Sequence, residues 1–225
     1  MKELKVRCSE LGNILVKPNN EELSVGAKSY VEKLFIENEY GFSEGLFTDP
    51  VLKGIEGESE AIDLVGENDN RYYFKNEVNF NNEYLTGTPD IVYLNELILD
   101  IKIPDNYRTF FNADLSNLYF AQGQGYMYLT GIKKFDLVYV LMPEPDSFLS
   151  SKLLRLSYRL TQSQYDNAEK QLLNNNKIIN SLPLNQRIRK FSFDYDSEFI
   201  EVAKRQIEKS RIYYETLFKQ YNLNN

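Results

Sequence analysis

The 225-residue chain has no histidine and a single cysteine, Cys8. Without histidine it cannot form a Ser-His-Asp triad, a histidine-ligated metal site or a histidine proton shuttle. One cysteine excludes an internal disulfide, a cysteine-ligated zinc site and an iron–sulfur cluster. Any acid–base or metal chemistry must therefore depend on carboxylates and lysines.

Long apolar runs are also absent. None approaches the roughly 20 residues that a membrane helix needs, and the N-terminal residues MKELKVRCSELG show no signal-peptide core, so we expect no membrane partner. Positive charge is scarce, with 26 Lys and Arg against 33 Asp and Glu and a net charge of −7. Such a balance is unusual for a nucleic-acid binder, since phosphate affinity comes mainly from Lys and Arg. Two basic clusters, at 152–159 and 187–190, are most simply read as solvated surface charge.

Neither a Pro/Gly/Ser linker nor an internal repeat divides the chain, which predicts a single domain over residues 1–225. Its core is expected at about 7–160, with C-terminal helices at about 162–221. The periodicity predicts helices at about 24–40 (with Ser24 as N-cap), 54–66, 114–130, 162–181 and 197–221. Strands are expected at 71–80, 91–93, 97–103, 135–142 and 152–158, those at 91–93 and 97–103 forming a hairpin. This order predicts an α/β (α+β) fold, in which a central mixed β-sheet is flanked by helices and extra helices follow at the C-terminal end.

The most informative residues lie in and before the second strand of that hairpin. Alternate side chains of a strand share a face, so Asp100 and Lys102 should point the same way. Asp90 follows Pro89 at the start of the preceding strand, and pairing of the two strands would bring Asp90 close to Asp100. Two carboxylates and one ammonium on a small patch suit a Mg²⁺-dependent phosphodiesterase. The alternative is a strand with an exposed Asp/Lys pair.

Glu58 is the next candidate. In the predicted helix it shares a stripe with Ala61, Ile62 and Val65, whereas the other acids form a separate polar stripe: Glu56, Glu60, Asp63 and Glu67. A carboxylate on a packed face must be paired, protonated or metal-bound, since an isolated buried charge costs several kcal/mol. We therefore prefer Glu58 as a third metal ligand. The alternative is a frayed first turn from which Glu58 reaches solvent.

Gln122 interrupts an apolar helical stripe, and Gln124 lies off that stripe. The stripe is formed by Leu115, Leu118, Tyr119, Tyr126 and Leu129. Gly123 and Gly125 each weaken a helix by roughly 1 kcal/mol unless close packing requires them. Gln122 is either a satisfied buried amide or a group that orients a ligand beside the carboxylates.

Taken in order, these motifs resemble the PD-(D/E)xK nuclease superfamily, and more closely the lambda-type phage exonucleases, also called YqaJ-type viral recombinases. The resemblance covers about residues 7–130. The matching motifs are Gly54, Glu58 and Ala61; Thr88-Pro89-Asp90; Asp100-Ile101-Lys102-Ile103-Pro104; Arg108; Ala121-Gln122-Gly123-Gln124; and Arg7-Cys8-Ser9-Glu10. The acid before the lysine is Asp100, where this family has glutamate.

The resemblance implies a restriction-endonuclease-like core and a Mg²⁺-dependent DNA exonuclease, with Mn²⁺ able to substitute. It would degrade ends of linear double-stranded DNA, 5′ to 3′, in phage-type recombination in the bacterial or phage-infected host cytoplasm. A homo-trimer and a single-strand annealing protein as partner are further implications.

The resemblance also implies roles for individual residues. Glu58, Asp90, Asp100 and the backbone carbonyl of Ile101 would hold the metal. Lys102 would position or activate the water, and Gln122 would contact the substrate or the lysine. The candidate DNA-phosphate contacts are Ser9, Thr88 and Arg108.

Two other functions remain open. An endonuclease or repair nuclease of the same superfamily would carry the same residues, but it would cut covalently closed circular DNA. A non-catalytic DNA-binding or assembly protein could keep the fold, although the intact acids and lysine argue against a degenerate site.

Overall fold

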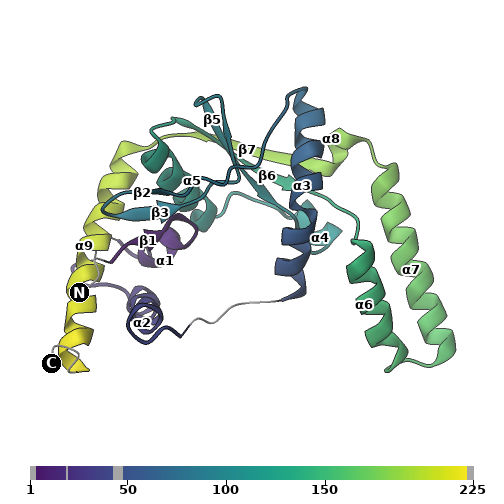
Figure 1. Ribbon diagram of the computed structural model, residues 1–225, viewed down its shortest axis with the longest axis horizontal. Coiled ribbons are helices and arrows are strands. Elements are labelled where there is room, and N and C mark those ends of the chain that lie inside the picture. Colours follow the sequence, from purple (N-terminus) through teal and green to yellow (C-terminus); the bar gives the residue numbers. More distant parts are fainter. Residues whose placement is uncertain (1–3, 19, 43–47, 222–225) are drawn as a thin grey trace.

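A computed structural model describes residues 4–18, 20–42 and 48–221 (Figure 1). Its main sheet has four strands in the order β4-β5-β6-β7. These strands are β4 (Ile91–Tyr93), β5 (Leu97–Lys102), β6 (Lys134–Val140) and β7 (Ile188–Asp194). β4 and β5 form the predicted antiparallel hairpin, β5 and β6 run parallel, and β7 is antiparallel to β6. The predicted mixed sheet is confirmed.

A small second sheet joins the N-terminal segment to the residues before Asp90. β3 (Leu85–Gly87) lies between β1 (Val6–Arg7), to which it is parallel, and β2 (Phe80–Asn81), to which it is antiparallel. A 3-10 turn, η1 (Cys8–Glu10), and the short helix α1 (Leu11–Ile14) follow β1. Since Arg7 is paired with Thr86, this sheet brings η1 close to the loop that leads to Asp90.

One face of the main sheet is covered by α5 (Asn117–Thr130). A Cβ atom on Gly123 would lie 2.5 Å from the ring of Phe193 and 2.8 Å from that of Phe135, so this glycine is required by close packing. α2 (Val25–Tyr40) and α9 (Ser197–Gln220) complete this layer. Ser24 caps α2 as predicted, because its Oγ accepts a hydrogen bond from the backbone N of Ala27 at 3.2 Å.

The opposite face is covered by α3 (Asp49–Asp69), which is longer at both ends than the predicted helix. Ala61, Ile62 and Val65 are buried against Leu99 and Ile101 of β5. A short helix, α8 (Leu184–Arg187), precedes β7, and α4 (Tyr107–Phe111) follows β5. β5 therefore lies between α5 on one face of the sheet and α3 on the other, and both helices can present side chains to it.

α6 (Asp146–Ser157) and α7 (Gln162–Ser181) form a helical hairpin that extends from the sheet (Figure 1). The predicted strand at 152–158 is wrong, since α6 occupies it. Leu149, Leu153 and Leu156 follow helical spacing and are buried or half-buried, so this periodicity, and not strand alternation, describes the segment. Among its described residues α7 has no buried side chain.

Two further differences concern the strands. Residues 71–79 are not a strand, and only Phe80 and Asn81 at the end of the predicted 71–80 segment join a ladder. Strand β7 was not predicted, since its first residues were read as part of a basic cluster, although Phe191 and Phe193 alternate with polar residues as in a half-buried strand.

The other predicted helices agree with the structure, α5 beginning three residues later and α7 and α9 within one residue of the predicted limits. In the part of the chain that the structure describes, no helix is both long and apolar enough to cross a membrane.

Candidate active site

Asp100 is the most deeply buried acid of the predicted site. It lies in the middle of β5 with 1% of its surface exposed, and its Oδ1 accepts a hydrogen bond from Nε2 of Gln122 on α5 at 2.9 Å. Gln122 also donates to the hydroxyl of Tyr126 at 3.2 Å, and that hydroxyl donates to the carbonyl of Thr88 at 3.3 Å. One network therefore connects β5, α5 and the loop before Asp90.

Lys102 shares the face of β5 with Asp100, as strand alternation predicted. Its Nζ lies 2.6 Å from Oδ2 of Asp100 and 5.1 Å from the centre of the Tyr119 ring. Burial by itself would lower the pKa of Lys102, but the adjacent Asp100 carboxylate outweighs it and raises the pKa above its usual range. Lys102 therefore stays protonated, and its ammonium group is fixed by Asp100. In this position it can orient an oxygen atom of water or phosphate.

Asp90 lies at the entry to β4, and its Oδ2 accepts a hydrogen bond from the backbone N of Ile101 at 2.6 Å. Burial, followed by the negative charge of Asp100, raises the pKa of Asp90 to about 7, and Glu58 contributes in the same direction. The charges of Asp100 and Glu58 therefore both disfavour ionisation of Asp90.

Glu58 lies on α3 within the packed stripe that the sequence predicted. Its side chain is 22% exposed, whereas Glu56, Glu60, Asp63 and Glu67 of the other stripe are all exposed. Because α3 begins at Asp49, Glu58 is well inside the helix and not in a frayed first turn. Its Oε2 pairs at 2.7 Å with Nζ of Lys75, a residue that the sequence reasoning did not single out because its segment was read as an ordinary strand.

The donor set fits a hard divalent cation. Asp100 precedes Ile101 in β5, and Asp90 accepts a hydrogen bond from the backbone N of Ile101, so both carboxylates lie at this part of the strand. Hard divalent cations prefer such oxygen ligands. The buried Oδ2 of Asp100 has the Lys102 ammonium beside it, yet it accepts no hydrogen bond of regular geometry from any described group. Among the described residues no three acidic or cysteine side chains lie together as a ready metal cluster, and Glu58 is paired with Lys75. Glu58 would join Asp90 and Asp100 by exchanging that partner.

The three residues predicted to contact DNA are all exposed. Ser9 is exposed in η1, and Thr88 is exposed with its Oγ1 accepting a hydrogen bond from Nδ2 of Asn79 at 3.1 Å. The β1–β3 pairing places their two segments side by side. Arg108 is exposed on α4, the helix that follows Lys102.

Gln124 differs from its neighbour Gln122 in what it binds. It is fully buried although it lies off the apolar stripe, because the C-terminal end of β7 and the start of α9 cover that side of α5. Its Nε2 donates to the carbonyl of Asp194 at 2.9 Å, and its Oε1 accepts from the backbone N of Asp196 at 2.8 Å. Gln124 is therefore a structural clamp, and Gln122 is the amide that faces the acids.

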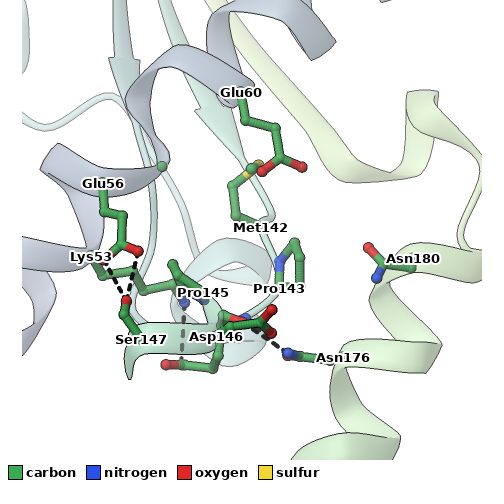
Figure 2. A pocket seen from close by; sticks show the side chains of 12 residues that line it. Lys53, Glu56, Glu60, Met142, Pro143, Pro145, Asp146, Ser147, Asn176 and Asn180 are labelled. Carbon is green, nitrogen blue, oxygen red and sulfur yellow. Dashed lines mark hydrogen bonds and ion pairs between the residues drawn. The ribbon is translucent and has the colours of Figure 1, made fainter. Parts of the chain in front are cut away.

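Lys53 is a second lysine that the sequence reasoning missed. It is 3% exposed, its Nζ donates to the carbonyl of Asp105 at 3.0 Å, and it pairs with Glu144 at 3.3 Å. It therefore fastens α3 to the turn after Lys102. Figure 2 shows the neighbouring pocket of about 430 Å³, where Ser147 donates a hydrogen bond to Glu56. None of the predicted site residues lines this pocket.

Comparison with solved structures shows that the fold is shared with exonucleases. The chain is similar to a phage-related exonuclease from Haemophilus somnus 129PT, with a TM-score of 0.79 and 24% identity over 98% of this chain and 97% of the other. It is also similar to an alkaline exonuclease from Laribacter hongkongensis, LHK-Exo, with a TM-score of 0.67 and 14% identity over 98% and 92%. The same enzyme in complex with dAMP gives a TM-score of 0.65 and 15% identity over 98% and 95%. No family model and no curated protein matches the sequence.

Proposed function

We propose that this protein is a Mg²⁺-dependent DNA exonuclease of the lambda type that acts on the ends of linear double-stranded DNA. The proposal rests mainly on the position of Asp90, Asp100 and Lys102 next to one another at β5. Gln122 on α5 donates a hydrogen bond to Asp100 and keeps that carboxylate in place. The fold that this site occupies is one that exonucleases use. The arrangement suits hydrolysis of a phosphodiester because it provides oxygen ligands for a cation and an ammonium beside them.

The residues that would hold the cation are Asp90, Asp100, the carbonyl of Ile101 and, after leaving Lys75, Glu58. When bound, Mg²⁺ would polarise the phosphodiester and lower the pKa of a coordinated water. Mn²⁺ is also an oxygen-preferring divalent ion and would substitute.

The chain's own groups have distinct tasks in this proposal. Lys102 keeps its proton beside Asp100 and orients the attacking water or a phosphate oxygen. Gln122 fixes the rotamer of Asp100 and, through Tyr126, the loop that carries Thr88. The phosphate contacts at the rim of the site would be Ser9, Thr88 and Arg108.

Further features of the proposal derive from the family resemblance. These are 5′-to-3′ digestion in phage-type recombination, location in the cytoplasm, a homo-trimer and a single-strand annealing protein as partner. Sedimentation of the purified protein tests the trimer, since a monomeric mass at micromolar concentration would contradict it.

Digestion of end-labelled linear duplex in Mg²⁺, with and without a 5′ phosphate, tests the function and its polarity. We expect release of nucleotides from linear DNA, none in EDTA, and no cutting of a covalently closed circle. Cutting of the circle would show an endonuclease. Intact linear DNA together with no Mg²⁺ or Mn²⁺ binding in calorimetry would show a non-catalytic protein.

A further inference from the structure

Lys75 belongs to a segment that lies against the site although it forms no strand. Its Nζ is 2.7 Å from Oε2 of Glu58. The next residue, Asn76, donates its backbone N–H to the carbonyl of Asp90 at 2.7 Å and its side-chain amide to the carbonyl of Pro89 at 2.9 Å. Lys75 is thus anchored beside two of the three acids.

The two lysines of the site differ in their access to solvent. The side chain of Lys102 is 26% exposed and pairs with the buried Asp100, whereas that of Lys75 is 54% exposed and pairs with Glu58. The hydrogen bond with Glu58 raises the pKa of Lys75, and the charge of Asp90 adds to this effect. A phosphate that approaches from solvent would therefore meet the Lys75 ammonium before that of Lys102.

The charges explain why Lys75 would change partner. The pKa of Asp90 is raised to about 7, so above that pH all three acids (Glu58, Asp90 and Asp100) are ionised. They then exceed the two ammonium groups of Lys75 and Lys102 by one negative charge, which repels a phosphodiester. A bound divalent cation would make the net charge of these groups +1. If Glu58 turns to that cation, Lys75 loses its partner while it remains at the solvent side of the site.

We infer that Lys75 is a ligand for a DNA phosphate, and that it exchanges Glu58 for that phosphate when Glu58 turns to the divalent cation. The inference rests on the proposed function, since it assigns a substrate contact to the same site. It makes DNA affinity depend on Lys75 only when a cation is present.

The test compares Lys75→Met, which removes the charge, with Lys75→Arg, which keeps it. Lys28→Met is the matched control. Lys28 lies on α2 and forms a similar ion pair, at 3.1 Å, with Glu22 in the segment before that helix. Binding of a fluorescent duplex end is measured by anisotropy in Ca²⁺, with a gel to verify that the DNA stays intact, and again in EDTA. Cation binding without DNA is measured by calorimetry with Mn²⁺.

In Ca²⁺ we expect Lys75→Met to weaken DNA binding about 5- to 10-fold and to reduce the slope of log affinity against log salt by about 0.9. In EDTA it should change little, and Lys75→Arg and Lys28→Met should resemble the unmodified protein. Mn²⁺ should bind Lys75→Met several-fold more tightly, since Glu58 then has no competing ammonium.

Unchanged DNA affinity and salt slope in Ca²⁺ would overturn the phosphate contact, and unchanged Mn²⁺ affinity would overturn the exchange. Both measurements are made without turnover, so they are independent of the digestion assay. If the unmodified protein degrades no DNA, the proposed function fails, whereas these results still decide whether Lys75 contacts phosphate. Thermal unfolding verifies that each variant is folded. If Lys75→Met does not fold, Lys75→Gln, which also removes the charge, takes its place in both measurements.

Discussion

The two sides of β5 hold their acids in different ways. On the α5 side Asp100 is almost fully buried, with Gln122 on one oxygen and Lys102 beside the other. On the α3 side Glu58 is partly exposed, and its partner Lys75 is more exposed still. The first acid is fixed by neighbours that cannot be replaced by water, whereas the second can change partner at little cost.

The energies of the two kinds of contact support this distinction. Loss of a partner for a buried polar group costs about 1–3 kcal/mol, and more for a charged group. An exposed ion pair contributes about 0–1 kcal/mol. The site therefore combines a rigid half, which sets the geometry, with an adjustable half, which can respond to a cation and a substrate.

The largest effect is expected in the rigid half. Asp100→Ala or Lys102→Ala should reduce Mg²⁺-dependent degradation of linear duplex by about 10³-fold or more, because each removes a group next to the reacting phosphate. End-labelled DNA measures the rate. Asp100→Asn keeps the side-chain size and serves as the folding control, and full activity in any of these variants would refute the assignment.

The two buried glutamines of α5 provide a matched pair. Gln122→Ala should lower activity about 10- to 100-fold, since it releases a ligand that must stay oriented. Gln124→Ala should leave the rate nearly unchanged, although both variants lose about 1–3 kcal/mol of unfolding free energy in urea. Equal losses of activity would show that Gln122 acts only through stability.

Glu58→Gln tests the adjustable half. We expect little change in stability, since its ion pair is partly exposed, and about a tenfold rise in the Mg²⁺ concentration for half-maximal rate. A Mg²⁺ titration of the initial rate measures it. Glu56→Gln on the outer stripe of α3 is the control, and a similar shift in that variant would attribute the effect to net charge alone.

The smallest effects are expected at the rim. Arg108→Gln, Ser9→Ala and Thr88→Val should each weaken binding of linear duplex a few-fold without altering stability, because all three positions are exposed. Only Arg108→Gln should reduce the salt dependence, since it alone removes a charge. Anisotropy at several salt concentrations measures both, and unchanged affinity in all three would place the DNA path elsewhere.

Much of the fold follows from local patterns. The β4–β5 hairpin, the cap of α2 and the packed stripe of α3 each depend on spacing that a single segment displays. The error at 71–79 has a cause outside the segment. The 71–79 segment alternates as a strand does, with Tyr73 buried and Tyr72 and Phe74 exposed, but no strand among the residues that the structure describes pairs with it.

Strand β7 shows the opposite error, a strand that was not predicted. Its basic residues suggested a solvated surface segment, but the segment pairs with β6 and forms part of the main sheet. Lys190 there pairs with Asp69 at 2.6 Å and lies 3.6 Å from Asp136, both from distant parts of the chain. Such contacts have no signature in the segment itself.

The sequence by itself determined the chemistry available, namely carboxylates and lysines without histidine, and the strand alternation that puts Asp100 and Lys102 on one face. Tertiary structure alone decided which partner each group has: Gln122 for Asp100, Lys75 for Glu58 and the turn after β5 for Lys53. The reason is physical. Residue type and backbone period fix what a side chain can do and which way it points, but burial and charge pairing depend on segments that only folding brings together.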